Sequence, residues 1–495
     1  MGINSGASAI QKMYVGSSLV NAAYAGLQSI LSGNLDAFAA IRQAATRRVD
    51  VVMLGDSNHH YGSYGFAWGL SKALQAKYGC YATGMQCPVA TSGTSSTTSA
   101  SVGNMTDNGY ASTETGLSSG NAAGFTALNA LWWTGIETGS NLIAPRARWC
   151  AQNGTSAQSL GGITLFEGNQ IGVANTLRFH VGFTRAPSGV LSGGSITPNV
   201  RYSRGSTAII FGAGGKTFSS TGGAAEEVAT DYFDIAAGAR TAGTDINMRA
   251  GGAANIVAPF SYLYSRVENP DANAGMSFHS LFSNAGKSAY DMHLSLSTYS
   301  TLAQLTNYFK EVRRLQISKG QTPVVVIYVN TNFNDANAPK SPTPDGGVTP
   351  AGSPGAFVHW MGQIKQRITE VWTTNGWATS ELNWLFVPSH KGTANVPAGT
   401  YATEYAPFVD NRAALSASAL GIAAQTNVLD LATVMNYATA LAGGWYSTQV
   451  DNGSGGWTLP AEGDMIHLTA ASNPGAYNAA SRGYDGVCAL IAGLI

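Results

Sequence analysis

Two parts of the chain alternate apolar, strand-like runs with segments whose apolar residues recur at helical spacing. Near the start, the run Val51–Leu54 predicts a strand over Val49–Leu54, followed by a helix over Gly65–Tyr78. After residue 276, the expected strands are Phe278–Phe282, Pro323–Val329, Trp384–Val387 and Asn427–Leu431, and the expected helices are Leu302–Ser318, Phe357–Thr373, Ala413–Thr426 and Gly483–Leu494. This alternation is typical of a parallel sheet wrapped by helices, so residues 45–94 and 276–495 predict one α/β domain.

The stretch between these parts, residues 95–275, has a different pattern. Pieces rich in Gly, Ser and Thr separate short strand-like runs at Leu177–Phe183, Val200–Tyr202, Thr207–Phe211 and Asp231–Ile235. Short strands with frequent turns are typical of a β-sandwich, and the stretch is too long to be a loop. We therefore expect an inserted β-rich, sandwich-like domain with carbohydrate binding as its candidate role. Trp132, Trp133 and Trp149 either stack on sugar rings or belong to its core.

Residues 1–44 form a third part, an N-terminal arm and helix. Apolar residues at helical spacing predict the helix over residues 27–48. Before it, Tyr14-Val15-Gly16 and Tyr24-Ala25-Gly26 lie among alternating apolar residues and predict a small hairpin. This segment resembles short elements of phage tail and other virion proteins, which implies a role in virion attachment. The other interpretation is an ordinary N-terminal arm.

Low and balanced charge excludes several classes of partner. Charged residues make up 11% of the chain, with 27 basic and 27 acidic side chains, so neither nucleic acid nor an anionic membrane is expected to bind. The longest apolar strand-like run, Val324–Val329, is too short to span a bilayer, and no signal peptide is visible at the N-terminus. A surface of Gly, Ser, Thr, Asn and Ala suits neutral glycans and is common in extracellular and virion proteins.

The cysteines do not indicate a metal site. Cys80, Cys87, Cys150 and Cys488 include no Cys-x-x-Cys pair, so we expect no metal and no cofactor. Cys80 and Cys87 are close enough in sequence for a small disulfide loop, and buried free thiols are the alternative.

The candidate chemistry lies near the two ends of the chain. Ser57 follows the first predicted strand, and the carboxyl edge of a parallel sheet is where open α/β folds bind their ligands. Asp464 and His467 stand three residues apart before the last predicted helix. A serine hydroxyl needs a base to become a nucleophile, and a carboxylate can orient that base, so the three residues predict a Ser-His-Asp triad. The Gly-x-Ser-x-Gly turn of the α/β-hydrolases is absent.

Four segments together resemble the sequence blocks of the SGNH (GDSL-like) hydrolase superfamily. They are Gly55-Asp56-Ser57, Asn284-Ala285-Gly286, Asn334-Asp335 and Asp464-Met465-Ile466-His467. The resemblance covers residues 45–80 and 276–495 and implies a three-layer fold with a parallel sheet. It also implies that Ser57 is the nucleophile, and that the oxyanion hole consists of the Ser57 and Gly286 N–H groups and the Asn334 side chain.

One position departs from the family pattern, because Asn332 stands where the third block has glycine. A register shift of two would make Asn332 the oxyanion donor instead. We prefer Asn334, since only it is followed by Asp.

These observations predict a serine esterase that hydrolyses O-acyl, in particular O-acetyl, esters on surface carbohydrate. The expected setting is a virion or the cell exterior, with an O-acylated glycan as substrate and virion proteins and further copies of the chain as candidate partners. The first alternative is a non-catalytic glycan-binding or structural virion protein on the same scaffold. The second is a lipase or thioesterase.

Overall fold

The computed structural model describes the better-placed parts of the chain. They are residues 14–15, 18–19, 36–56, 66–85, 99–102, 110–113, 117–118, 148–150, 163–165, 175–185, 195–196, 199–204, 207–212, 218–219, 222–223, 225, 227–236, 245–249, 256–257, 260–283, 287–331, 335, 342–388, 410–418, 420, 428–431, 445, 450–451, 457–458, 468 and 483–495. No helix among them is long and apolar enough to cross a membrane.

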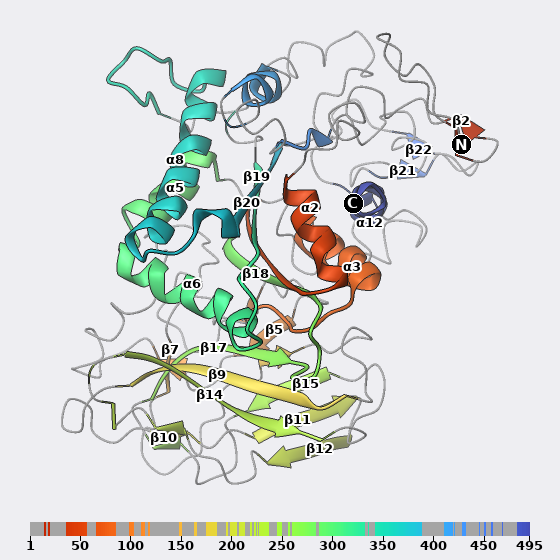
Figure 1. Cartoon of the computed structure of the whole chain (residues 1–495), viewed down its shortest axis with the longest axis vertical. Coiled ribbons are helices and arrows are strands. Elements are labelled where there is room, and N and C mark those ends of the chain that lie inside the picture. The colour runs from red at the N-terminus through yellow and green to blue at the C-terminus, as the bar shows by residue number, and fades with distance from the viewer. Residues whose placement is uncertain are drawn as a thin grey trace.

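A four-stranded parallel sheet lies at the centre of the α/β part (Figure 1). Its order is β18-β3-β19-β20, with bounds Gly275–Ser283, Arg48–Gly55, Val325–Thr331 and Leu382–Pro388. The strands are almost entirely buried because helices cover both faces, which is the usual setting of a parallel sheet. The α/β prediction is therefore confirmed at the level of the sheet.

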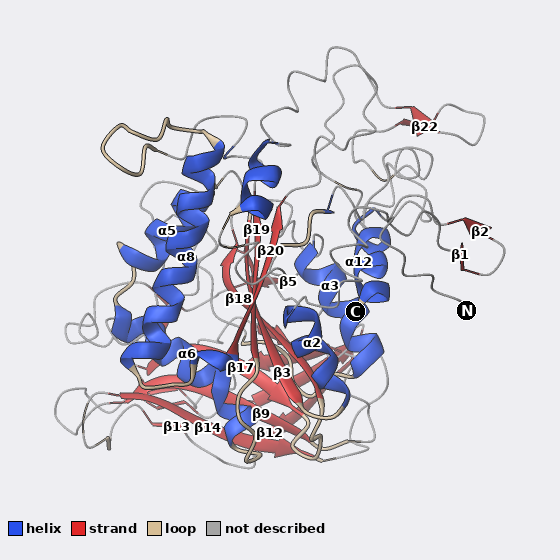
Figure 2. Cartoon of the chain, turned by 45° about the horizontal axis from the view of Figure 1, so that its top comes forward, coloured by secondary structure: helices blue, strands red, loops and turns tan. Residues whose placement is uncertain are grey.

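Helices pack on both faces of this sheet. On one face lie α2 (Asp36–Arg42), α3 (Phe66–Tyr78) and α12 (Gly483–Leu494), and on the other α5 (Ala289–Ser297), α6 (Leu302–Ile317) and α8 (Pro354–Thr374) (Figure 2). Residues along β3 alternate between two cores: Val51 and Met53 join the first helices, and Val52 and Leu54 join the second.

A β-bulge interrupts β18 just before its end. The pairing with β3 shifts between Ser280 and Phe282, so Leu281 is an extra residue. Met276 and Phe278, which precede the bulge, belong to the core under α3. Leu281 in the bulge and Phe282 after it belong to the core under α5. The bulge therefore changes the face that the strand presents as it enters the following loop.

Every element that the structure describes between residues 99 and 268 is a strand, as the sequence predicts. A five-stranded antiparallel sheet has the order β14-β9-β17-β7-β6, and a four-stranded one has the order β12-β11-β15-β8. The short strands are β6 (Leu117–Ser118), β7 (Arg148–Cys150), β8 (Ile163–Leu165) and β15 (Asp245–Arg249). The longer strands are β9 (Leu177–Arg185), β14 (Glu227–Ile235), β17 (Phe260–Glu268), β11 (Asn199–Arg204) and β12 (Thr207–Gly212). A separate sandwich-like domain over 95–275, and the other domain boundaries, stay predictions.

The strand-rich stretch joins the parallel sheet directly. β17 ends at Glu268 and β18 begins at Gly275, where a positive φ of 118° and a close approach to the backbone of Tyr81 suit glycine. Arg48 holds this turn, because its guanidinium donates to the carbonyl oxygens of Ala272, at 2.7 and 2.9 Å, and Asn269, at 3.3 Å. The connection is therefore short and fixed at both ends.

Asp50 of β3 is the centre of a buried polar network at this junction. Its Oδ1 accepts hydrogen bonds from the Tyr81 hydroxyl at 2.6 Å, Arg266 Nη2 at 2.7 Å and His279 Nε2 at 2.8 Å, and Gln316 Nε2 donates to Oδ2 at 2.7 Å. Burial by itself raises the pKa of Asp50, but the Arg266 charge and these donors lower it to about 2. The carboxylate is therefore ionised, fully buried and satisfied.

A second buried pair lies beside the first. Arg48 Nη1 donates to Glu268 Oε1 at 2.6 Å, and the other oxygen of Glu268 meets His180 Nε2 at 2.7 Å. Although burial raises the pKa of Glu268, His180 and Arg48 lower it to about 2. Strands β3, β9 and β17 are thus joined by charged groups far apart in the sequence.

Several predicted bounds need correction. The helix predicted over 27–48 is described as α2 and a 3₁₀ turn (Gln43–Ala45), and β3 already begins at Arg48, because the charged Arg48 is buried in the polar network. Val428 forms only an isolated parallel bridge to Phe386. Helix α5 was missed altogether. At the N-terminus β1 (Tyr14–Val15) pairs with β2 (Ser18–Leu19), so the first Tyr-x-Gly unit lies in a hairpin, whereas Tyr24-Ala25-Gly26 lies outside the described residues.

Acid should destabilise the protein through its buried histidines. Burial lowers the pKa of His180 and of His279 to about 4, whereas an unfolded chain protonates histidine near pH 6.5. Between these values the unfolded state binds more protons than the folded state. The free energy of unfolding therefore decreases as the pH is lowered, by about 1.4 kcal/mol per pH unit for each histidine. In urea denaturation at pH 7, 6 and 5, His279→Gln should flatten this slope by one histidine's share. An unchanged slope in the variant would contradict the assignment.

Candidate active site

Three strands of the parallel sheet end side by side. Ser283 of β18 and Asn330 of β19 both pair in register with Gly55 of β3, and Asn330 pairs with Val387 of β20. The Asp56 N–H donates to the Asn330 carbonyl oxygen at 3.2 Å, which extends the pairing by one residue. Since neighbouring strands lie about 4.8 Å apart, the segments that follow leave the sheet next to one another.

The predicted site residues come directly after these strand ends. Ser57, Gly286 and Asn334 follow Gly55, Ser283 and Thr331 by two or three residues, and they lie outside the described residues. Asn332, Asp464 and His467 do as well, so their geometry and the choice between Asn332 and Asn334 stay predictions. What the structure describes is the frame around them.

Asp335 is the main element of that frame. It is 1% exposed, and both of its carboxylate oxygens accept the Ala289 N–H at 3.2 Å. Thr331 Oγ1 donates to Oδ2 at 3.2 Å. Ala289 is the first residue of α5, where a negative charge is favoured by the helix dipole. Asp335 therefore joins the end of β19 to the start of α5, across the two loops that carry Asn334 and Gly286.

The start of α5 is also fixed from within. Ser288 and Asp291 form a capping box, with the Ser288 N–H donating to Asp291 Oδ2 at 2.8 Å and the Asp291 N–H donating to Ser288 Oγ at 3.3 Å. Lys287 follows Gly286 directly, and its Nζ lies 3.9 Å from Asp291 Oδ1. The chain thus leaves the Gly286 loop into a firmly capped helix.

The C-terminal part lies beside the helix that follows β3. Helix α12 packs on α3, with the rings of Tyr484 and Phe66 edge-to-face at 5.1 Å, and Gly69 leaves no room for a side chain against Cys488. Leu468, the residue after His467, is 2% exposed and belongs to the same core. Leu468 therefore joins α3 and α12 in one core, whereas Asp464–His467 lie outside the described residues.

From the sequence alone, Asp335 is recognised only as part of the Asn334-Asp335 block, without a role of its own. The sequence does contain an indication of this role, because an acidic residue four positions after a buried strand can reach the start of a neighbouring helix. The Ser288-x-x-Asp291 spacing is likewise a capping-box pattern, which indicates the start of a helix.

His279 and the buried cysteines are structural. His279 Nδ1 accepts the Met85 N–H at 3.1 Å, so the neutral ring carries its proton on Nε2, toward Asp50. Cys80 and Cys488 are free buried thiols, which rules out the Cys80–Cys87 loop, and burial raises the pKa of Cys80 to about 12. In the part of the chain that the structure describes, no three His, Cys, Asp or Glu side chains gather as metal ligands.

Comparison with known proteins gives weak likenesses only. No protein-family model matches the chain, and no curated protein sequence matches it significantly. A structure of a peptidoglycan O-acetylesterase matches with TM-score 0.43 and 12% identity over 93% of this chain and 95% of its own. Clostridium thermocellum xylanase 10B matches with TM-score 0.19 and 8% identity over 53% of this chain and 55% of its own. A family two carbohydrate esterase from Cellvibrio japonicus matches with TM-score 0.13 and 6% identity over 55% and 90%. All three scores lie below 0.5, so neither fold nor activity is carried over to this chain.

We expect Asp335→Ala to impair an activity housed at this edge without unfolding the protein. Losing the carboxylate frees the start of α5 from the β19 loop, and misplacing catalytic groups by about 1 Å can lower kcat about a hundredfold. The measurement is kcat and KM on a short-chain p-nitrophenyl ester, with exposed Asp345→Ala as control. Asp335→Asn, which keeps an acceptor oxygen, should retain more activity. A fully active, folded Asp335→Ala protein would contradict this role.

Proposed function

We propose that the chain is a serine ester hydrolase that removes O-acyl, in particular O-acetyl, groups from carbohydrate. The observation that carries the proposal is the row of strand ends Ser283, Gly55 and Asn330. It starts the loops of Gly286, Ser57 and Asn334 from adjacent positions on the carboxyl edge, where open α/β folds bind ligands. Asp335 fastens two of these loops together.

In this proposal, Ser57 Oγ attacks the acyl carbon while His467 takes the hydroxyl proton, and Asp464 orients the imidazole and stabilises its charged form. A bond forms between Oγ and carbon, and the carbonyl π electrons move to oxygen. When the intermediate collapses, the bond to the sugar oxygen breaks, and that oxygen leaves with the proton from His467. Water then attacks the acyl-serine in the same way and releases the carboxylic acid.

The oxyanion of each tetrahedral intermediate receives the Ser57 and Gly286 N–H groups and the Asn334 amide. One such donor contributes about 3–4 kcal/mol to the rate. These donors act only when three loops are held in register, and Asp335 together with the Ser288–Asp291 box serves that purpose for two of them. The proposed role of Asp335 is thus positioning, through its hydrogen bonds to Ala289 and Thr331.

The carbohydrate substrate is supported by the low, balanced charge and by the strand-rich stretch that accompanies the α/β part. The virion or extracellular setting rests on the N-terminal resemblance alone. No observation favours a non-catalytic glycan-binding protein, and that alternative becomes an outcome of the first test below.

Ser57→Ala should lower ester hydrolysis at least about a thousandfold, since a triad nucleophile has no substitute. Activity on p-nitrophenyl acetate, butyrate and octanoate is the measurement, with exposed Ser318→Ala as the control variant and circular dichroism as the check on folding. Activity should fall with acyl length. Rates that rise with length indicate a lipase, and an unaltered rate in Ser57→Ala, or no hydrolysis of any ester by the native chain, refutes the proposal in favour of a binding protein.

Replacing the oxyanion amide should lower kcat about 10²–10³-fold with little change in KM, because the donor acts on charge that develops in the transition state. We expect this for Asn334→Ala and not for Asn332→Ala, measured in parallel on p-nitrophenyl acetate. If only the Asn332 variant loses kcat, the assigned register is wrong by two residues.

A further inference from the structure

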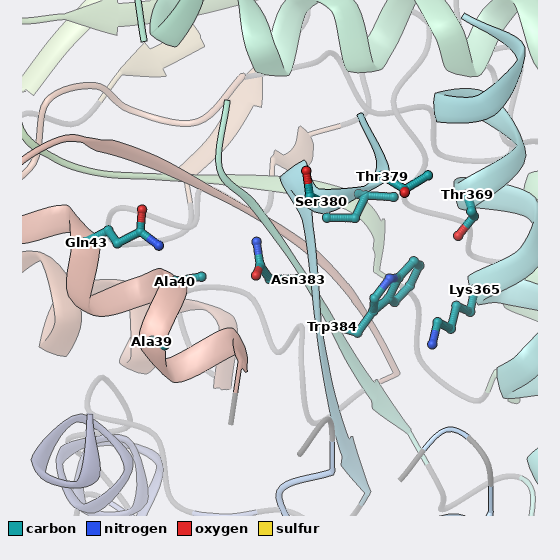
Figure 3. Close-up of a pocket in the computed structure, with 10 residues that line it drawn as sticks. Ala39, Ala40, Gln43, Lys365, Thr369, Thr379, Ser380, Asn383 and Trp384 are labelled. Atoms are coloured by element: carbon teal, nitrogen blue, oxygen red, sulfur yellow. The ribbon is translucent and has the colours of Figure 1, made fainter. Parts of the chain in front are cut away.

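A hollow of about 510 Å³ opens at the start of β20, at the end of the strand away from the candidate active site (Figure 3). Helix α2 borders it on one face of the sheet and α8 on the other, and the strand edge lies between them. Asn383 in the hollow and Val387 in the row of strand ends are separated by about 13 Å along the strand. No part of the proposed esterase mechanism uses this hollow.

The strand edge inside the hollow carries backbone groups that face outward. The Phe386 carbonyl oxygen accepts the Leu429 N–H at 2.8 Å, and Phe386 bridges Val428 in parallel, so the outer edge is covered from there onward. Alternation along the strand turns the N–H and C=O of Trp384 to the same outer edge. No strand in the described ranges pairs with this lower part of β20.

Lys365 of α8 is a half-buried cation in the hollow, and none of the described residues serves as its counter-ion. Its ammonium lies 6.0 Å from the centre of the Trp384 ring, and no carboxylate of the described residues is within ion-pair distance of it. None of the described residues that line the hollow is acidic. Burial lowers the pKa of Lys365, which reflects the cost of leaving this charge unpaired.

Two acidic residues of the neighbouring elements are already bound to arginines. Glu381, just before β20, accepts two hydrogen bonds from Arg313, at 2.7 and 2.8 Å, and Glu370 of α8 accepts one from Arg367 at 2.7 Å. The buried cations Arg48 and Arg266 are paired as well. Lys365 therefore lies in the hollow with no described carboxylate to neutralise its charge, and its position indicates an anion from outside.

The rest of the lining narrows the chemistry of that anion. Hydroxyls of Thr369 and Ser380 and amides of Asn383 and Gln43 face the hollow (Figure 3). Neutral hydrogen-bonding groups thus outnumber the single charge, and Trp384 adds an apolar surface. A ligand with one negative charge and several hydroxyls can satisfy all of these groups.

We propose that the hollow binds an acidic sugar, with its carboxylate on the Lys365 ammonium and its hydroxyls on the neutral polar side chains. A peptide strand would use the same edge, but the open part spans only Leu382–Trp384, which is too short to specify a strand. The ligand is either a free sugar acid or one residue of an acidic polysaccharide, since both present the same groups. This site does not depend on the proposed esterase activity.

Equilibrium dialysis with radiolabelled glucuronate tests the proposal on the full chain. We expect one site per chain, and at least tenfold weaker binding in Lys365→Met, because a charge-assisted hydrogen bond is lost. Lys365→Arg keeps the charge and should bind within a few-fold of the native chain. Exposed Lys310→Met is the matched control and should bind as the native chain does.

Competition defines the ligand class. Unlabelled glucuronate should displace the label, whereas glucose, which lacks the charge, and acetate, which lacks the hydroxyls, should each need at least a tenfold higher concentration. An oligogalacturonate that competes better than the monomer identifies the polymer as the source, and equal competition per residue identifies the free acid. The proposal is overturned if no stoichiometric binding occurs, if Lys365→Met binds as tightly as the native chain, if glucose or acetate competes as well as glucuronate, or if an acidic peptide does.

Discussion

The buried carboxylate of Asp50 is the constraint on which the rest of the structure depends. It collects donors from β17, β18, α6 and the segment after α3, which lie up to 266 residues from Asp50 in sequence. A buried ion pair is not by itself a large source of stability, since well-packed apolar residues can do as well. Its specific effect is that only one arrangement of these elements satisfies every donor, and an unsatisfied charge in this core would cost several kcal/mol.

This constraint at one end of the sheet determines the geometry at the other end. Asp50 pairs in register with Ser277 of β18 and Val325 of β19, and the same ladders lead to the row of Ser283, Gly55 and Asn330. A slip of one residue would displace a strand end by about 3.3 Å and turn its side chains to the other face. The polar network therefore serves the candidate active site from a distance, by keeping three loop origins level. Close to the candidate site, Asp335 then holds the start of α5 next to the end of β19.

How much of this could be predicted differs between the sheet and its polar groups. The apolar runs of β3 and β19 and the helical spacing of apolar residues in α12 were enough to predict these elements. Burial on one or both faces of an element leaves such a pattern in the local sequence. Helix α5 was missed since it is short and its start is marked by Ser288 and Asp291 rather than by an apolar face. The partners of Asp50, and the absence of a carboxylate beside Lys365 among the described residues, depend on contacts between distant segments, and no local pattern encodes these. The roles of Ser57, Gly286 and Asn334 stay predictions from the sequence.

The turn between β17 and β18 has a mechanical consequence. Only residues 269–274 separate the two strands, and Arg48 clamps the turn to the first strand of the parallel sheet. A force applied to the strand-rich stretch would pass along β17 directly into β18, because no flexible linker separates the two strands. If that stretch grips a surface, its hold also dictates how the carboxyl edge of the sheet is tilted toward that surface.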